Sequence, residues 1–155
     1  MKIKEFMIPD VISVRKDMKI KELLKTMVEH KIGGVPVVDE HNQLIGIISD
    51  GDVIRYLQPN GRTIYDAFSM VFVTEMVGLK QKVETSIEHH SEEIMKKGVY
   101  TVRPDDEIEV AVSIFSRYHF KKIPVVNDSD QVLGVISRGD IIRSIYNKAI
   151  AEMDG

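Results

Sequence analysis

The chain has 155 residues, a net charge of −3 at neutral pH and no cysteine, which excludes a disulfide framework, a thiolate nucleophile and cysteine-ligated metal. Hydrophobic residues make up 43% and charged residues 29% of it, the composition of a globular protein rather than a disordered one. Lysines and arginines are scattered along the chain, so nucleic acid is not expected to be the main partner.

No segment is suited to a membrane. The longest nearly apolar run, at 67–73, is far shorter than the roughly 20 residues that span a bilayer. The first ten residues also lack the apolar stretch of a secretory signal. We therefore expect no membrane partner and a cytoplasmic location.

The second half of the chain repeats the first at a constant offset of 88 residues. Aligned without a gap, Glu5–Leu57 and Glu93–Ile145 are identical at 18 of 53 positions. A tandem duplication is the simplest origin, so the fold must be interpreted repeat by repeat.

Each repeat predicts the same succession of elements. In the first repeat these are a short strand at 11–14, a helix from Ile20, a strand-turn-strand unit at 35–49 and a helix at 52–57. The second repeat gives the same order 88 residues later. Asp17 and Asp105 stand where they would cap the first helix of each repeat. One apolar helical face is expected to comprise Ile20, Leu23, Leu24, Met27 and Val28, and its counterpart Ile108, Ala111, Val112 and Phe115.

The segment between the repeats, 59–90, has no counterpart. Gln58–Gly61 is a run that stops a helix. Beyond it, apolar stripes at 64–72 and at 79–94 predict helices. These helices would either cover the module or form a docking surface for a second subunit or a partner protein.

Each repeat contains one motif that has two interpretations. Ser49 is followed three residues later by Asp52, and Ser137 by Asp140, each time at the start of a predicted helix. That spacing is a capping box, in which the serine and the acidic residue satisfy backbone N–H groups at the helix start. Aspartate is shorter than the usual Glu or Gln, and a glycine in the box lets another molecule approach the backbone. The motif therefore also indicates a ligand site.

The doubled pattern of an apolar residue, Pro-Val-Val, and then Gly-x-x-Ser-x-x-Asp resembles a tandem of CBS domains, the module named after cystathionine β-synthase. The resemblance covers about residues 3–57 and 91–146. It implies an α/β (α+β) fold in which two β-α-β-β-α units pack as a pseudo-two-fold pair. The expected divisions are a first unit at 1–58, a helical insert at 59–90, a second unit at 91–150 and a tail at 151–155.

The same resemblance implies a regulatory module whose clefts bind adenosine derivatives, with AMP, ADP or ATP expected before S-adenosylmethionine or NADH. By position, Asp52 and Asp140 would accept hydrogen bonds from ribose hydroxyls, and Ser49 and Ser137 would contact ribose or phosphate. A carboxylate can accept from two adjacent hydroxyls, and a helix start suits a phosphate. The residues implied for gripping the purine are Ser13, Val14, Gly34, Val35, Thr101, Val102, Lys122 and Ile123, although simple core packing is the alternative for each valine.

The two repeats differ where a phosphate would lie. Gly33-Gly34 in the first repeat corresponds to Lys121-Lys122 in the second. These lysines are phosphate candidates, and Arg138 is another. The alternative for the lysine pair is a solvated surface.

No enzyme is expected. The sequence has no P-loop and no dinucleotide fingerprint, and no nucleophile, base and orienting residue can be assembled from it. The five histidines lack metal-ligand spacing, so no metal and no obligatory cofactor are expected. We expect a homodimer that regulates an unidentified protein. The alternatives are a structural or partner-binding CBS module with degenerate sites, and the sensor part of a transcription or nucleic-acid regulator.

Overall fold

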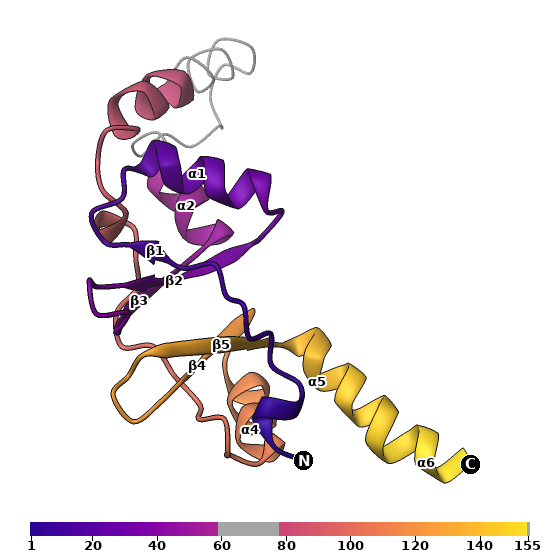
Figure 1. Cartoon of the computed structure of the whole chain (residues 1–155). Helices are drawn as coiled ribbons and strands as arrows, with labels where there is room; N and C mark the ends of the chain where they lie inside the picture. The colour runs from indigo at the N-terminus through magenta and orange to yellow at the C-terminus, as the bar shows by residue number, and fades with distance from the viewer. Residues whose placement is uncertain (59–77, 155) are drawn as a thin grey trace, which may run out of the picture.

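Two similar α/β units lie one beside the other in the computed structural model, which describes residues 1–58 and 78–154 (Figure 1). The first unit contains β1 (Val14–Arg15), α1 (Ile20–Glu29), β2 (Gly34–Val38), β3 (Leu44–Ser49) and α2 (Asp50–Leu57). The second contains α4 (Ile108–Arg117), β4 (Lys122–Val126), β5 (Val132–Ser137) and α5 (Arg138–Ile145). Short 3-10 turns precede the two units, η1 (Ile3–Glu5) and η2 (Ser91–Glu93). The described residues end in a π-helical turn, η3 (Tyr146–Ile150), and in α6 (Ala151–Asp154).

The sheets repeat one another, and the predicted α/β fold is confirmed. In the first sheet, β1 runs parallel to β2, which pairs with β3 in the antiparallel sense. In the second sheet β4 pairs antiparallel with β5, and a single bridge from Val102 to Val125 takes the place of β1. The first strand of each repeat is thus shorter than the β-branched runs predict.

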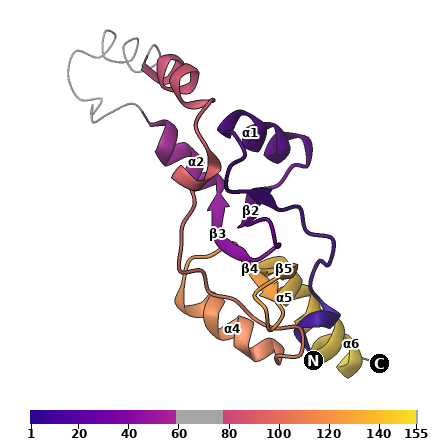
Figure 2. The same cartoon turned by 60° about the vertical axis from the view of Figure 1, so that its left-hand side comes forward.

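Each unit has its own hydrophobic core. Figure 2 shows the helices of both units and the two sheets from a second side. The buried residues of the first core include Val14, Ile20, Leu23, Val35, Val37 and Ile48. Those of the second core include Val102, Ile108, Ala111, Ile123, Val125 and Ile136. The helical faces predicted from the apolar spacing supply residues to both cores, except that Val28 is 76% exposed and Val112 is also exposed.

The segments that lead into the repeats cross between the units. Ile3, at the start of the chain, is fully buried in the second core, and the backbone of Ile8 pairs with that of Val135 at N–O distances of 2.8 and 3.1 Å. In return, Ile94 is buried in the first core, and Lys96 pairs with Ile47 at 2.9 and 3.0 Å. Each core is therefore completed by a segment that precedes the other repeat in sequence.

This crossing explains why the predicted caps at Asp17 and Asp105 are wrong. The N-cap positions are Lys19 and Glu107, two residues after these aspartates, and neither makes a side-chain cap. The N–H of Ile20 donates instead to the carbonyl of His89 at 2.8 Å, and that of Ile108 to the carbonyl of Met1 at 3.0 Å. Because the crossing segments satisfy these N–H groups, no side-chain cap is needed.

Part of the insert falls within the described residues. Residues 78–86 are helical, Leu79 is exposed, and Ile94 is buried. Helix α2 ends at Leu57, as the stop signal predicts. The apolar stripe predicted at 64–72 lies outside the described residues.

The close approach of the crossing segments requires glycine on the strands that they contact. A Cβ at Gly134 would lie 2.7 Å from the carbonyl oxygen of Ile8. We expect Gly134→Ala to destabilise the protein by about 1–3 kcal/mol, because the backbone of the crossing segment must shift. Gly139→Ala on α5, whose Cβ would meet nothing closer than 3.6 Å, is the matched control and should be neutral or stabilising. Urea unfolding measures both, and equal stability of the two variants would contradict this packing.

Candidate functional site

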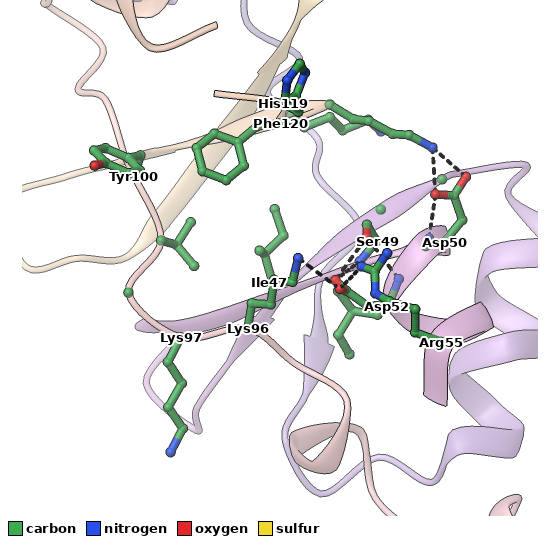
Figure 3. Close-up of a pocket in the computed structure, with 18 residues that line it drawn as sticks. Ile47, Ser49, Asp50, Asp52, Arg55, Lys96, Lys97, Tyr100, His119 and Phe120 are labelled. Carbon is green, nitrogen blue, oxygen red and sulfur yellow. Dashed lines mark hydrogen bonds and ion pairs between the residues drawn. The ribbon is translucent and has the colours of Figure 1, made fainter. Parts of the chain in front are cut away.

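A cavity of about 590 Å³ lies where the two units meet (Figure 3). One wall comes from the first unit, at 33–34 and 47–52. The remaining walls come from 96–100, which begins beside β3, and from 119–122, at the start of β4. The cavity therefore brings together residues of both repeats and of the segment that crosses between them.

The motif of the first repeat forms the capping box and also faces this cavity. The Ser49 hydroxyl accepts from the backbone N–H of Asp52 at 3.2 Å, and the Asp52 carboxylate accepts from the Ser49 N–H at 2.9 Å. Both residues line the cavity. The structural interpretation of the motif is thus correct, and the same side chains are placed to meet a ligand.

Asp52 is a buried and ionised carboxylate. It is only 6% exposed. Its second oxygen accepts from Arg55 at 2.7 Å and lies 3.3 Å from the Lys96 ammonium. Burial by itself raises the pKa of Asp52, but the hydrogen bonds from Ser49 and the neighbouring cations outweigh it and hold the pKa below its usual range.

The second repeat reproduces the capping box. The backbone N–H of Ser137 donates to the Asp140 carboxylate at 2.8 Å. Arg143 forms an ion pair with that carboxylate, just as Arg55 forms one with Asp52. Asp140 is buried. Ser137 and Asp140 do not line the cavity around Asp52, so the two motifs stand at separate places.

The predicted phosphate candidates have different surroundings. Lys121 and Lys122 both line the cavity around Asp52. The Lys121 ammonium also donates to both carboxylate oxygens of Asp50, at 2.6 and 2.7 Å, which lowers the pKa of Asp50. Arg138 lies outside the lining residues, and its guanidinium donates to the carbonyls of Tyr118 and Phe120.

Several residues predicted to grip the purine are core residues instead. The side chains of Val14, Val35, Val102 and Ile123 are at most 1% exposed and pack in the two cores. The strand faces that carry them point inward, so these side chains are closed to a ligand, and purine contacts through their backbone groups stay a prediction. Gly34 does line the cavity, Thr101 lines a smaller hollow nearby, and Ser13 lines neither.

Sequence reasoning missed the segment from Lys96 to Tyr100 and the pair His119-Phe120, all of which line the cavity. The aromatic rings of Tyr100 and Phe120 lie 5.7 Å apart, and Tyr100 stacks on Tyr118 at 4.6 Å. Figure 3 shows Tyr100, His119 and Phe120 across the cavity from Asp52. The repeat alignment gives no signal for the aromatic residues Tyr100 and Phe120, because their counterparts in the first repeat, Ile12 and Ile32, are not aromatic.

The cavity is cationic although the chain is acidic. Its lining residues include two aspartates, Asp50 and Asp52, against five lysines and arginines, namely Arg55, Lys96, Lys97, Lys121 and Lys122. Such a surplus favours an anionic ligand. Within the described residues, no group of three or more His, Asp or Glu side chains could hold a metal ion, and no helix is long and apolar enough to cross a membrane.

Known proteins share this architecture. The family model for the CBS domain matches residues 3–59 and 91–147. The chain is 28% identical over 146 residues to the L-aspartate semialdehyde sulfurtransferase of Methanocaldococcus jannaschii, a match that spans 94% of this chain but only 23% of that protein.

Solved structures give the same result. The CBS-pair protein CBSX2 of Arabidopsis thaliana, in complex with AMP, is 21% identical with a TM-score of 0.72, covering 94% of this chain and 96% of that one. The CBS domain pair of protein MJ0100, in complex with 5′-methylthioadenosine and S-adenosyl-L-methionine, is 25% identical with a TM-score of 0.68, covering 96% and 98%. The chain belongs to the CBS domain family and carries a tandem pair of CBS units.

The ionised state of Asp52 predicts a pH dependence of stability. A carboxyl whose folded pKa is lowered stabilises the fold above its ordinary pKa of about 4, and this contribution is lost as the pH falls through the folded value. We expect Asp52→Asn to unfold more easily than wild type by about 1–3 kcal/mol at pH 7. The difference should shrink below about pH 4. Urea unfolding from pH 7 to pH 3 measures it, and a difference that stays constant with pH would contradict an ionised Asp52.

Proposed function

We propose that this CBS pair is a non-catalytic sensor that binds an adenine nucleotide, AMP, ADP or ATP, in the cavity around Asp52. The observation that carries the proposal is a buried, ionised carboxylate in a cavity otherwise dominated by cations. A nucleotide offers both matching groups, since ribose hydroxyls donate and phosphates carry negative charge.

The ribose would be held by Asp52. A carboxylate that accepts from two adjacent hydroxyls gains charge-assisted hydrogen bonds, which are stronger than neutral ones. Arg55 and Lys96 now occupy one oxygen of Asp52, but both side chains are 62% exposed and long enough to turn away. A bound ribose would replace them and leave both cations beside the nucleotide.

The charge of the cavity favours phosphate-bearing ligands. Lys122 and Lys97 line the cavity, and the buried Asp52 carboxylate would still be available to ribose. S-adenosylmethionine carries a sulfonium cation that this surplus of positive charge would repel. The AMP complex of CBSX2 supports the choice of nucleotide, and the complex of MJ0100 supports the broader class of adenosine derivatives.

The base would meet the aromatic side of the cavity. Tyr100 and Phe120 stand opposite Asp52, and flat rings offer a surface on which a purine can stack. The volume of about 590 Å³ falls within the range of about 300–1,000 Å³ typical of small-molecule sites.

Binding would act on the contact between the two units. The Asp50–Lys121 ion pair joins the first unit to the second at the cavity. A phosphate beside Lys121 competes with Asp50 for the same ammonium, so occupancy changes an inter-unit contact. That change is the signal that a regulated protein would sense.

A substitution at Lys122 tests whether the cavity recognises the phosphate of the nucleotide. We expect Lys122→Gln to weaken AMP binding about tenfold or more, because one charge-assisted contact is lost, while adenosine binds as before. Isothermal calorimetry with both ligands measures this. Lys80→Gln, a change in the insert outside the cavity, is the matched control.

Two results would count against the proposal. Wild-type protein that binds neither AMP, ADP nor ATP at millimolar concentration would favour a structural module with degenerate sites. Equal losses of AMP and adenosine in Lys122→Gln would show that Lys122 shapes the cavity rather than attracting the phosphate.

We also propose that the chain forms a homodimer through its C-terminal helix. The helical stretch from α5 to α6 projects from the second unit (Figure 1). Large apolar side chains remain exposed along it, namely Ile142, Ile145, Tyr146, Ile150 and Met153. Closed two-fold dimers are the commonest way in which soluble proteins cover such a face.

Light scattering tests the dimer. We expect twice the chain mass of 17.6 kDa at micromolar concentration for the wild type. The double variant Ile142→Lys/Tyr146→Lys should have the monomer mass, since it places charge on the apolar face, whereas Lys148→Glu, on another face of the same helix, should leave the dimer intact. A wild type that remains at 17.6 kDa would contradict this assembly.

A further inference from the structure

The connection from the first helix to the next strand, α1 to β2 and α4 to β4, is stabilised in different ways in the two repeats. In the first repeat, α1 ends through Lys31, whose φ of 52° is left-handed. The backbone N–H of Ile32 donates to the carbonyl of Met27 at 3.1 Å. This helix end is therefore closed by its own backbone, in the manner of a left-handed C-terminal cap.

In the second repeat an arginine side chain stabilises the connection by hydrogen bonds to its backbone carbonyls. Tyr118, at the end of α4, is extended with φ −127° and ψ 151°, so the chain leaves the helix without a left-handed residue. The Arg138 guanidinium donates through Nη2 to the carbonyl of Tyr118 at 3.1 Å and through Nε to that of Phe120 at 2.9 Å. It also lies 5.8 Å from the centre of the Phe115 ring.

The position equivalent to Arg138 in the first repeat also contacts this segment. That position is Asp50, which follows Ser49 as Arg138 follows Ser137. Asp50 accepts two hydrogen bonds from Lys121. The two residues have opposite charges, and together they fix the segment 118–121, one by its backbone carbonyls and the other by a side chain.

This segment is a wall of the Asp52 cavity. His119, Phe120 and Lys121 all line it, whereas Arg138 does not. We infer that Arg138 is a positioning residue for this cavity, so that the motif of the second repeat sets the ligand affinity at the first. The inference rests on the proposed nucleotide site and assigns to Arg138 a role other than the phosphate contact expected from the sequence.

A positioning residue and a residue that recognises charge affect ligand binding differently. A residue that contacts phosphate affects AMP and leaves adenosine unchanged. A residue that holds the wall affects both ligands, because Phe120 and His119 stand opposite the ribose-binding carboxylate and meet the nucleoside itself. Lysine at this position keeps the charge but lacks the planar guanidinium that reaches both carbonyls.

The experiment compares Arg138→Ala and Arg138→Lys with wild type. The control is Arg103→Ala, which removes an exposed arginine paired with Asp128 in the same repeat and outside the cavity. Hydrogen exchange of the peptide 118–122 is measured without ligand, and calorimetry measures the affinity for AMP and for adenosine.

We expect faster exchange of 118–122 in Arg138→Ala and a loss of affinity of about three- to tenfold that is equal for the two ligands. Arg138→Lys should fall between wild type and the alanine variant, and Arg103→Ala should match wild type. Full recovery with lysine, a loss confined to AMP, or unchanged exchange and affinity would each overturn the inference. If the wild type binds neither ligand while exchange still accelerates in Arg138→Ala, the proposed nucleotide site is wrong. Arg138 would then still position the segment 118–121.

Discussion

The crossing of the two leading segments is the constraint on which the other features depend. Ile3 completes the second core and Ile94 completes the first, so neither unit can bury its apolar surface alone. The chain that returns from Ile94 pairs with β3 through Lys96 and then runs on to Tyr100 along the cavity. The same packing that stabilises the fold therefore builds one wall of the candidate site beside the Asp52 carboxylate.

Duplication gave two copies of the motif that now have different neighbours. Asp52 and Asp140 keep the same capping box, because both helices still need their first N–H groups satisfied. The residue after each motif serine takes no part in the capping box, and it is Asp50 in one copy and Arg138 in the other. The Asp50 carboxylate still accepts from the N–H of Gly51 in the first turn of α2. Their opposite charges act on one shared segment, so a symmetric scaffold carries an asymmetric site.

Local patterns in the sequence predicted the repeated fold and some of the residues that line the candidate site. Periodicity located the strands and helices, and the Ser-x-x-Asp spacing located a carboxylate that does face a cavity. Periodicity cannot distinguish a ligand-facing valine from a core valine, and the side chains of Val14 and Val35 lie in the core. Asp17 was misplaced as a cap because a carbonyl from a distant segment takes that role. The wall at Lys96–Tyr100 arises from the crossing, and no local pattern reveals a contact between segments so far apart.

The most direct test of nucleotide binding at Asp52 is a crystal structure of the chain grown with AMP. We expect the ribose hydroxyls within hydrogen-bonding distance of the Asp52 carboxylate, the purine against Tyr100 and Phe120, and the phosphate beside Lys122. Arg55 and Lys96 should have turned away from Asp52. A nucleotide bound elsewhere, or a cavity in which Arg55 and Lys96 still hold Asp52 at saturating AMP, would contradict this binding mode.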